Sequence, residues 1–404
     1  MKIYNYIIVI LSLLILTSCG FDRNPSTYET TPELLDLQPE SPSVLDLPEI
    51  KFKTKLEQLL DEMSLDEKIG QLFIVRPESL HQDQTNNIGT VEIDEEMKEI
   101  IKTYPVGGVV LFSENIVSPE QLTTFIKSLQ LESQIPLFMG IDEEGGRVSR
   151  IAQSPNFEVP QFKSMGNIGE TNDDDNARNV GFVIGSYLKD YGFNLNFAPV
   201  ADTNTNPDNI VIGNRSFGSN PELVSRMVLA EIKGLHEAKI MSCTKHFPGH
   251  GNTKGDTHEG YVSIDKTWSE LEDQELIPFI HSIDLTDMVM ISHITTPNIT
   301  SDQMPASLST EMIEGKLRKE LGYKGVIISD AMEMEAVAKE YTSSEIAVKG
   351  ILAGLDLILM PKDFVEAFNS IKMAVEEGMI SEARIDESVL RILELKERYN
   401  LLSR

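Results

Sequence analysis

Eight short apolar runs, rich in β-branched residues and separated by longer stretches of helical periodicity, constrain the fold of this chain most strongly. Such runs are typical of strands buried on both faces, and helices between them indicate parallel βα units. Two of the intervening stretches open on Ser118-Pro119 and Asn220-Pro221, which is typical of a helix N-terminus. The predicted strands are GQLFIV from residue 70, GGVVLF from 107, PLFMGID from 136, FNLNFAP from 193, IMSCTKHF from 240, DMVMISHI from 287, GVIISDAM from 325 and LDLILM from 355.

Eight consecutive βα units without a break in composition predict an α/β fold, a closed (β/α)8 TIM-type barrel that residues 51–404 form as a single domain. An open, doubly wound sheet is the alternative. No G-x-G-x-x-G turn follows the first predicted strand, which disfavours a dinucleotide-binding sheet of that kind.

Residues 1–18 have the composition of an export signal peptide, with an apolar run followed by small residues. The tetrapeptide LTSC, which ends at Cys19, resembles a bacterial lipobox. The resemblance implies that Cys19 is lipidated and anchors the exported chain at the outer face of the cytoplasmic membrane. A soluble secreted product and an uncleaved membrane anchor are the alternatives. Residues 19–50 are acidic and proline-rich and are predicted to form a flexible tether, because they bury too little apolar surface to fold.

The chain carries a formal charge of −29, from 64 acidic and 35 basic residues. A field of this sign excludes nucleic acid as a partner and is typical of a solvated, acidic surface. Besides Cys19 the only cysteine is Cys243, so no disulfide is expected once Cys19 is acylated. Cys243 lies in an apolar run, where we expect a buried small side chain rather than a nucleophile.

Polar residues stand at the ends of five of the predicted strands. In a barrel these ends meet at one mouth, where the catalytic and binding residues lie. A single such residue is as readily explained by hydrogen bonding in a core or a loop, whereas five strand ends at one mouth indicate a functional site. The residues are Asp142 after the third strand, Asp202 shortly past the fourth, Lys245 and His246 at the fifth, His293 at the sixth and Asp330 at the seventh.

The segment KHFPGHGNTKGDTHEG, residues 245–260, concentrates histidines, acids and glycines on one loop. His246 and His250 have the spacing of two metal ligands on a helix, but Pro248 and Gly249 between them preclude a helix, so we expect no metal site. The glycines predict sharp turns and a close approach of the backbone to a ligand, in a loop that moves or wraps.

Asp256 stands two residues before His258, and a carboxylate beside an imidazole orients the ring and raises its basicity. The pair predicts a general acid/base at His258, with a hydrogen-bonded turn as the alternative.

Asp330 emerges from a wholly apolar run, where an ionised carboxylate needs nearby cations. Lys245, Arg150 and Arg215 are the candidates. An anionic Asp330 facing a protonated His258 would place a nucleophile and a proton donor in one pocket.

The motifs KHFPGHG followed by GDTH, together with GIDEEGGRVSR, GNRSFG and GVIISDAMEM, resemble those of the bacterial single-domain β-N-acetylglucosaminidases, or β-hexosaminidases, of glycoside hydrolase family 3. The likeness covers most of residues 51–404. It implies a single catalytic domain and a retaining reaction, in which Asp330 attacks the anomeric carbon and His258 protonates the departing oxygen. Asp256 would polarise His258, and no cofactor is implied.

The same resemblance implies a subsite for N-acetylglucosamine. One departure is Glu143, where the family more often has glutamine; it is expected to add negative charge at the mouth. The expected substrate is a glycan with terminal N-acetylglucosamine, either a muropeptide or a chitin oligosaccharide, and the chain is expected to act as a monomer. The subsite residues would be Asp142, Arg150, Arg215, Lys245 and His246.

Four other functions stay open at the level of sequence. The glycosyl group can pass to phosphate rather than to water, which would make the protein a phosphorylase. Larger relatives with the same barrel are β-glucosidases or xylosidases. A metal-dependent hydrolase would use His246, His250, His258 and His293, and a non-catalytic lipoprotein would bind sugar without turnover.

Overall fold

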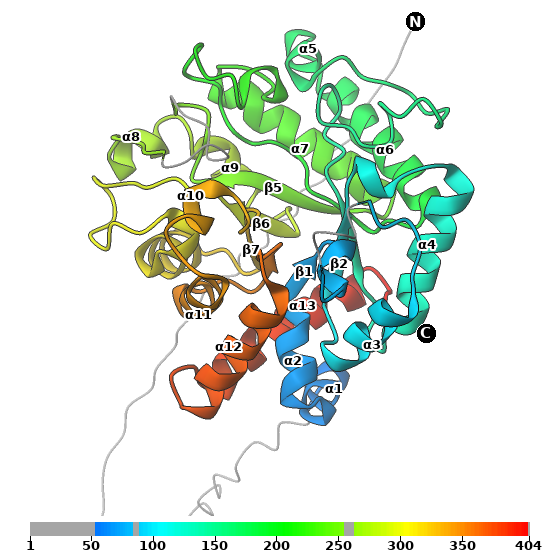
Figure 1. Cartoon of the computed structure of the whole chain (residues 1–404). Coiled ribbons are helices and arrows are strands. Elements are labelled where there is room, and N and C mark those ends of the chain that lie inside the picture. Colours follow the sequence, from blue (N-terminus) through cyan, green and yellow to red (C-terminus); the bar gives the residue numbers. More distant parts are fainter. Residues whose placement is uncertain (1–52, 84–88, 254–261, 403–404) are drawn as a thin grey trace, which may run out of the picture. The chain divides into compact units, whose positions relative to one another are not determined.

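The computed structural model describes residues 53–83, 89–253 and 262–402. The predicted signal peptide, the tether and Cys19 lie outside these ranges, as do Asp256 and His258. Figure 1 shows the described residues as strands surrounded by helices.

Eight parallel strands form one sheet in the order β7-β6-β5-β4-β3-β2-β1-β8. A parallel bridge between Ile328 and Leu357 joins the two ends of this order, so that β7 meets β8 and the barrel closes. Each strand lies within one of the eight predicted runs, which confirms the (β/α)8 barrel. The strands are β1 (Phe73–Val75), β2 (Gly108–Leu111), β3 (Phe138–Ile141), β4 (Leu195–Asn196), β5 (Met241–Phe247), β6 (Met288–Ile291), β7 (Val326–Ser329) and β8 (Ile358–Leu359).

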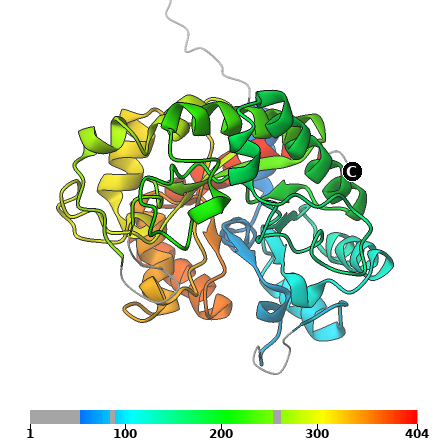
Figure 2. The same cartoon turned by 90° about the horizontal axis from the view of Figure 1, so that it is seen from above.

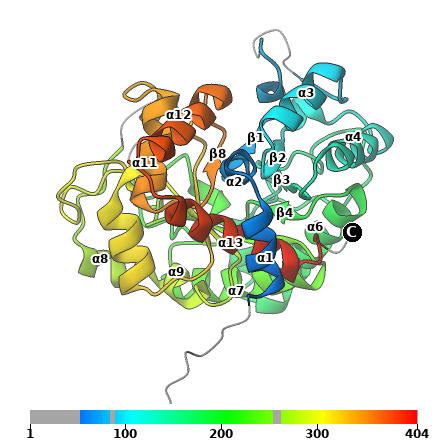
Figure 3. The same cartoon turned by 90° about the horizontal axis from the view of Figure 1, so that it is seen from below.

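Helices lie around the outside of the strands, as the views from above and below show (Figures 2 and 3). Short 3-10 helices connect some of them: η1 (Pro77–Leu80), η3 (Ser113–Asn115), η4 (Gly213–Arg215) and η5 (Ala306–Leu308). The longer elements are α1 (Lys55–Glu62), α2 (Leu65–Gln71), α3 (Glu95–Thr103), α4 (Pro119–Glu132), α5 (Met165–Glu170), α6 (Asp174–Tyr191), α7 (Pro221–Glu237), α8 (Trp268–Glu272), α9 (Ile277–Ser282), the π-helix η6 (Glu311–Glu320), α10 (Glu335–Ala338), α11 (Ser343–Ala353), α12 (Phe364–Glu376) and α13 (Glu382–Arg398).

The predicted helix starts are confirmed at α4 and α7. The Ser118 hydroxyl accepts a hydrogen bond from the backbone N–H of Gln121, and Pro119 occupies the first turn of α4. The Asn220 side chain accepts from the N–H groups of the second and third residues of α7 in the same way. These caps satisfy backbone donors that the first turn of a helix leaves without an acceptor.

Every strand residue is buried, and most of the strand residues are apolar. Cys243 of β5 has no exposed surface, and burial raises the pKa of its thiol. The expectation that Cys243 is a core side chain is therefore confirmed. Over residues 53–83, 89–253 and 262–402, no helix is both long and apolar enough to cross a membrane.

The last helix, α13, packs against α1 and α2 beneath the barrel (Figure 3). Its Lys396 has no exposed surface, and the ammonium donates hydrogen bonds to Gln71 Oε1 at 2.7 Å and to the carbonyl of Gly107 at 3.1 Å. The same nitrogen lies 4.7 Å from the centroid of the Phe138 ring. Burial lowers the pKa of Lys396 to about 7.

We expect Lys396→Met to change the pH dependence of stability. The pKa of Lys396 falls from 10.5 in the unfolded chain to about 7 in the fold, so its burial costs nothing above pH 10.5 and costs most below pH 7. That difference corresponds to about 5 kcal/mol at most. In urea unfolding, the free energy of unfolding of the wild type should rise from pH 6 to pH 9.5 by several kcal/mol more than that of the variant.

The control is Lys233→Met, which removes an exposed lysine of α7. The free energy of unfolding of all three proteins is measured against pH. If Lys396→Met showed the same pH dependence as the wild type and the control, the lowered pKa of Lys396 in the fold would be contradicted.

Candidate active site

The carboxyl ends of the strands surround a cavity of about 310 Å³. This volume is within the range of small-molecule sites. All six predicted site residues that the structure describes line it: Asp142, Arg150, Arg215, Lys245, His246 and Asp330. The sequence prediction of one shared mouth is thereby confirmed for them, whereas Asp202 and His293 lie behind the lining.

Lys245 is the most enclosed cation of the site, with 3% of its side chain exposed. Its ammonium lies 2.7 Å from Asp142 Oδ1 and 2.6 Å from Glu144 Oε1. These two carboxylates offset the loss of hydration, and the pKa of Lys245 is raised even though burial alone would lower it. Lys245 is therefore a permanent positive charge in the cavity wall.

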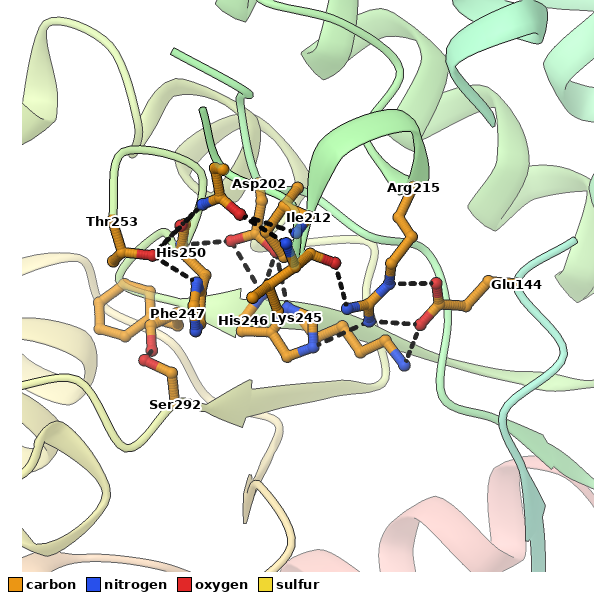
Figure 4. A network of polar contacts seen from close by, with 12 residues as sticks. Glu144, Asp202, Ile212, Arg215, Lys245, His246, Phe247, His250, Thr253 and Ser292 are labelled. Atoms are coloured by element: carbon orange, nitrogen blue, oxygen red, sulfur yellow. Dashed lines mark hydrogen bonds and ion pairs between the residues drawn. The ribbon is translucent and has the colours of Figure 1, made fainter. Parts of the chain in front are cut away.

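Arg215, from η4, forms a bidentate pair of hydrogen bonds with the same Glu144. Its Nε and Nη2 each donate over 2.8 Å to the two carboxylate oxygens. Figure 4 shows the Glu144 carboxylate in contact with both Arg215 and Lys245, and His246 in contact with Arg215. Burial would raise the pKa of Glu144, but the two cations outweigh it and hold the pKa well below its ordinary value.

His246 is oriented by Asp202, which is completely buried. His246 Nδ1 lies 2.6 Å from Asp202 Oδ2, and the backbone N–H groups of His246 and His250 also donate to this carboxylate. On the other side of the ring, Nε2 lies 3.3 Å from Arg215 Nη2 (Figure 4). Asp202 thus has the role of a positioning residue rather than of a cavity lining.

Arg150 and Asp142 also line the cavity. Arg150 Nη2 lies 3.8 Å from Asp142 Oδ2, and its guanidinium carbon lies 5.3 Å from the centroid of the Phe112 ring. Asp142 therefore receives one cation from its own loop and a second from Lys245 of β5. Its carboxylate is held in place in the cavity wall by these two cations.

Glu143 does not lie at the mouth, and the expectation of added negative charge there is wrong. Its side chain is completely buried and accepts hydrogen bonds from the backbone N–H groups of residues 150, 151 and 152. The Tyr187 hydroxyl donates a further bond of 2.9 Å. Burial raises the pKa of Glu143, and these four donors oppose that shift. Glu143 thus fixes the loop that carries Arg150.

Asp330 follows β7 and is partly exposed to the cavity. Its Oδ1 accepts a 2.8 Å hydrogen bond from the N–H of Ala331. Burial disfavours the charge, but His246, His293, this N–H and Lys245 outweigh it, so the pKa of Asp330 is lowered. The expected stabilisation by Lys245 is confirmed, while the two imidazoles replace the arginines expected beside it.

One cavity residue, Glu144, was missed by the sequence reasoning, while Asp202 and His250 were named there without the roles that the structure gives them. Glu144 is the second of two adjacent glutamates, and the sequence contains no signal that distinguishes it from Glu143. Asp202 stood out only as a strand-end residue. His250 lines the cavity, and its Nδ1 lies 2.9 Å from the hydroxyl of Thr253.

In the loop after β5, Gly251 lies close to another stretch of backbone, whereas the predicted approach to a ligand stays a prediction and Gly255 lies outside the described residues. A Cβ on Gly251 would come within 2.0 Å of the carbonyl oxygen of Thr203, and Gly249 has a φ of +122°. His293 is held by the hydroxyl of Ser307 at 2.7 Å and the carbonyl of Ala331 at 2.9 Å. Within the described part of the chain, no three His, Cys, Asp or Glu side chains are grouped so as to hold a metal ion.

Comparisons with known proteins agree with this geometry. The family model described as the glycosyl hydrolase family 3 N terminal domain matches residues 64–395. Beta-hexosaminidase A of Pseudoalteromonas piscicida is 33% identical over 329 residues, which are 75% of this chain and 55% of that protein. The beta-hexosaminidase of Idiomarina loihiensis is 33% identical over 281 residues, which are 69% of this chain and 83% of that protein.

Among solved structures, the chain is similar to a glycoside hydrolase family 3 beta-N-acetylglucosaminidase from Paenibacillus sp. str. FPU-7. The TM-score is 0.78 at 36% identity, and the match covers 84% of this chain and 63% of that one. The chain thus spans little more than half of the Pseudoalteromonas protein and less than two thirds of the Paenibacillus one.

We expect Glu143→Gln to loosen the loop that carries Arg150. A glutamine offers an NH2 group where the carboxylate accepts hydrogen bonds, so at least one buried N–H loses its acceptor. Such a loss costs about 1–3 kcal/mol of the free energy of unfolding. Chemical unfolding measures this cost, and Glu158→Gln, an exposed position of the same loop, is the control. Equal stability of the two variants would show that Glu143 does not hold the loop.

Proposed function

Because this chain belongs to glycosyl hydrolase family 3, we propose that it is a retaining β-N-acetylhexosaminidase, which releases terminal, non-reducing β-linked N-acetylglucosamine from glycans. The observation that supports this most is the environment of Asp330. A carboxylate whose pKa is lowered stands in the cavity wall beside cations and imidazoles. It is thus available as an ionised nucleophile at neutral pH.

In the proposed reaction, an Asp330 carboxylate oxygen attacks the anomeric carbon while the bond to the leaving oxygen breaks. His258 gives its proton to that oxygen, and a glycosyl ester of Asp330 forms. Water then attacks the anomeric carbon, His258 takes a proton from it, and the carboxylate is released. Asp256 holds the imidazole in the required tautomer and favours its charged form. The roles of His258 and Asp256 rest on the sequence.

The remaining polar lining supports a sugar subsite. Asp142, held by Lys245 and Arg150, presents carboxylate oxygens to sugar hydroxyls. Lys245 and Arg215 present N–H donors from a rigid, buried network, and His246 is fixed by Asp202. A preorganised set of this kind can bind the terminal sugar without ordering its side chains at each turnover.

We further propose, from the sequence, that the protein is exported and anchored through a lipidated Cys19. At the outer face of the membrane it would meet cell-wall glycans and their fragments. Metabolic labelling with a tritiated fatty acid should label the wild type and not Cys19→Ala, whose product should leave the membrane fraction. Label on the Cys19→Ala protein would contradict anchoring at this residue.

We expect Asp330→Asn to abolish turnover, because the amide is a poor nucleophile. We expect His258→Ala to lose about 10²- to 10⁴-fold on substrates whose leaving group needs a proton. The loss should be much smaller on 4-nitrophenyl β-N-acetylglucosaminide, whose leaving group departs as a stable anion. The measurement is kcat/KM for the aryl glycoside and for a disaccharide with each variant.

Equal losses on both substrates would contradict His258 as the acid.

A second experiment identifies the sugar product with and without inorganic phosphate. Free N-acetylglucosamine in both cases supports a hydrolase, whereas N-acetylglucosamine 1-phosphate would make the protein a phosphorylase.

A further inference from the structure

The outer rim of the cavity carries a group of charged side chains around one aromatic ring, which none of the roles above uses. Phe112 follows β2 and Glu333 lies three residues after Asp330, and both line the cavity. Arg76 follows β1 and contacts both of them. With Glu114 of η3, these residues form what we call the rim cluster.

Three carboxylates lie within 4 Å of the Arg76 guanidinium. Its Nη1 lies 3.2 Å from Glu333 Oε1, its Nη2 lies 2.5 Å from Glu114 Oε1, and its Nε lies 3.5 Å from Glu78 Oε2. Two arginines, Arg76 and Arg150, thus face three glutamates around the Phe112 ring, and the five side chains have a formal charge of −1. The guanidinium groups of Arg76 and Arg150 both lie near Phe112, at 4.9 and 5.3 Å from the ring centroid.

The rim cluster is more exposed than the deep wall of the cavity. The side chains of Glu333 and Glu114 are 37% and 38% exposed, whereas those of Lys245 and Glu144 are 3% and 2% exposed. An enzyme that removes a terminal sugar binds that sugar at the deep end of its cavity. The rest of the glycan, which is the leaving group, must therefore pass the rim.

We propose that Phe112 and Glu333 belong to the leaving-group subsite, and that Glu333 makes this subsite selective for neutral over anionic leaving groups. The proposal rests on the proposed function. Glu333 acts in two ways: it occupies a donor face of Arg76 that an anionic group would otherwise use, and it repels such a group directly. Repulsion of the wrong ligand is a common source of specificity.

The proposal assigns a substrate class. A glycan whose next unit is uncharged, such as a second N-acetylglucosamine, fits the rim. A glycan whose next sugar bears a carboxylate, such as muramic acid, meets an excess of negative charge.

The test compares two aryl glycosides that differ by one carboxylate: 4-nitrophenyl β-N-acetylglucosaminide and its 3-carboxy-4-nitrophenyl counterpart. The measured quantity is the ratio of kcat/KM for the anionic to that for the neutral substrate. Since each ratio is compared between enzymes, the intrinsic reactivity of the two leaving groups cancels. We expect Glu333→Gln to raise the ratio about fivefold, which corresponds to the upper end for a partly exposed ion pair.

The matched control is Glu335→Gln, which removes the same charge two residues away, at a position that does not line the cavity. We expect its ratio to equal that of the wild type. In the wild type, added salt should raise the ratio by screening the rim, which tests the proposal even if the Glu333 variant does not fold.

The proposed selectivity would be overturned if Glu333→Gln left the ratio unchanged, or if both variants raised it equally. In either case, turnover of the neutral substrate would still support the proposed function. A wild-type ratio that falls on addition of salt would also overturn it. No turnover of either substrate would overturn both proposals.

Discussion

The buried ammonium of Lys245 determines the arrangement of the charged side chains around the cavity. A cation with so little contact with water is tolerated only when carboxylates replace its hydration, and Asp142 and Glu144 do so at 2.7 and 2.6 Å. Glu144 in turn needs Arg215, because one ammonium cannot satisfy both of its oxygens. The network therefore joins strand β5 to the loops after β3 and β4.

The opposite end of the barrel is held by networks of another kind. Asp287, before β6, accepts hydrogen bonds from the N–H of Ser242 and from the hydroxyl of Tyr399, just past α13. Lys396 on the same helix reaches the starts of β1 and β2. These contacts secure the last helix to the amino ends of the strands, whereas the polar residues that line the cavity lie at the carboxyl ends. This division is the general one for barrels of this type.

Within the mouth, depth separates two tasks. The deep wall is charge-compensated, and under the proposed function it recognises the terminal sugar. The rim is exposed and has an excess of negative charge, and under the same proposal it selects what is attached to that sugar. Asp330 and Glu333 lie only three residues apart, and this short segment after β7 links the two tasks.

By itself, the sequence determined the eight strands, the capped helix starts and the set of polar residues at the strand ends. Those features are local: apolar runs, turn residues and caps act over a few positions, and barrel topology then brings all strand ends to one mouth. Only the tertiary structure decided between Glu143 and Glu144, two identical side chains in adjacent positions. One turns inward to Tyr187 and the backbone of residues 150–152, and the other turns to Lys245 and Arg215. Tyr187 lies 44 positions after Glu143, and Lys245 lies 101 positions after Glu144. Because these partners are so distant in the chain, no local sequence pattern distinguishes the two glutamates.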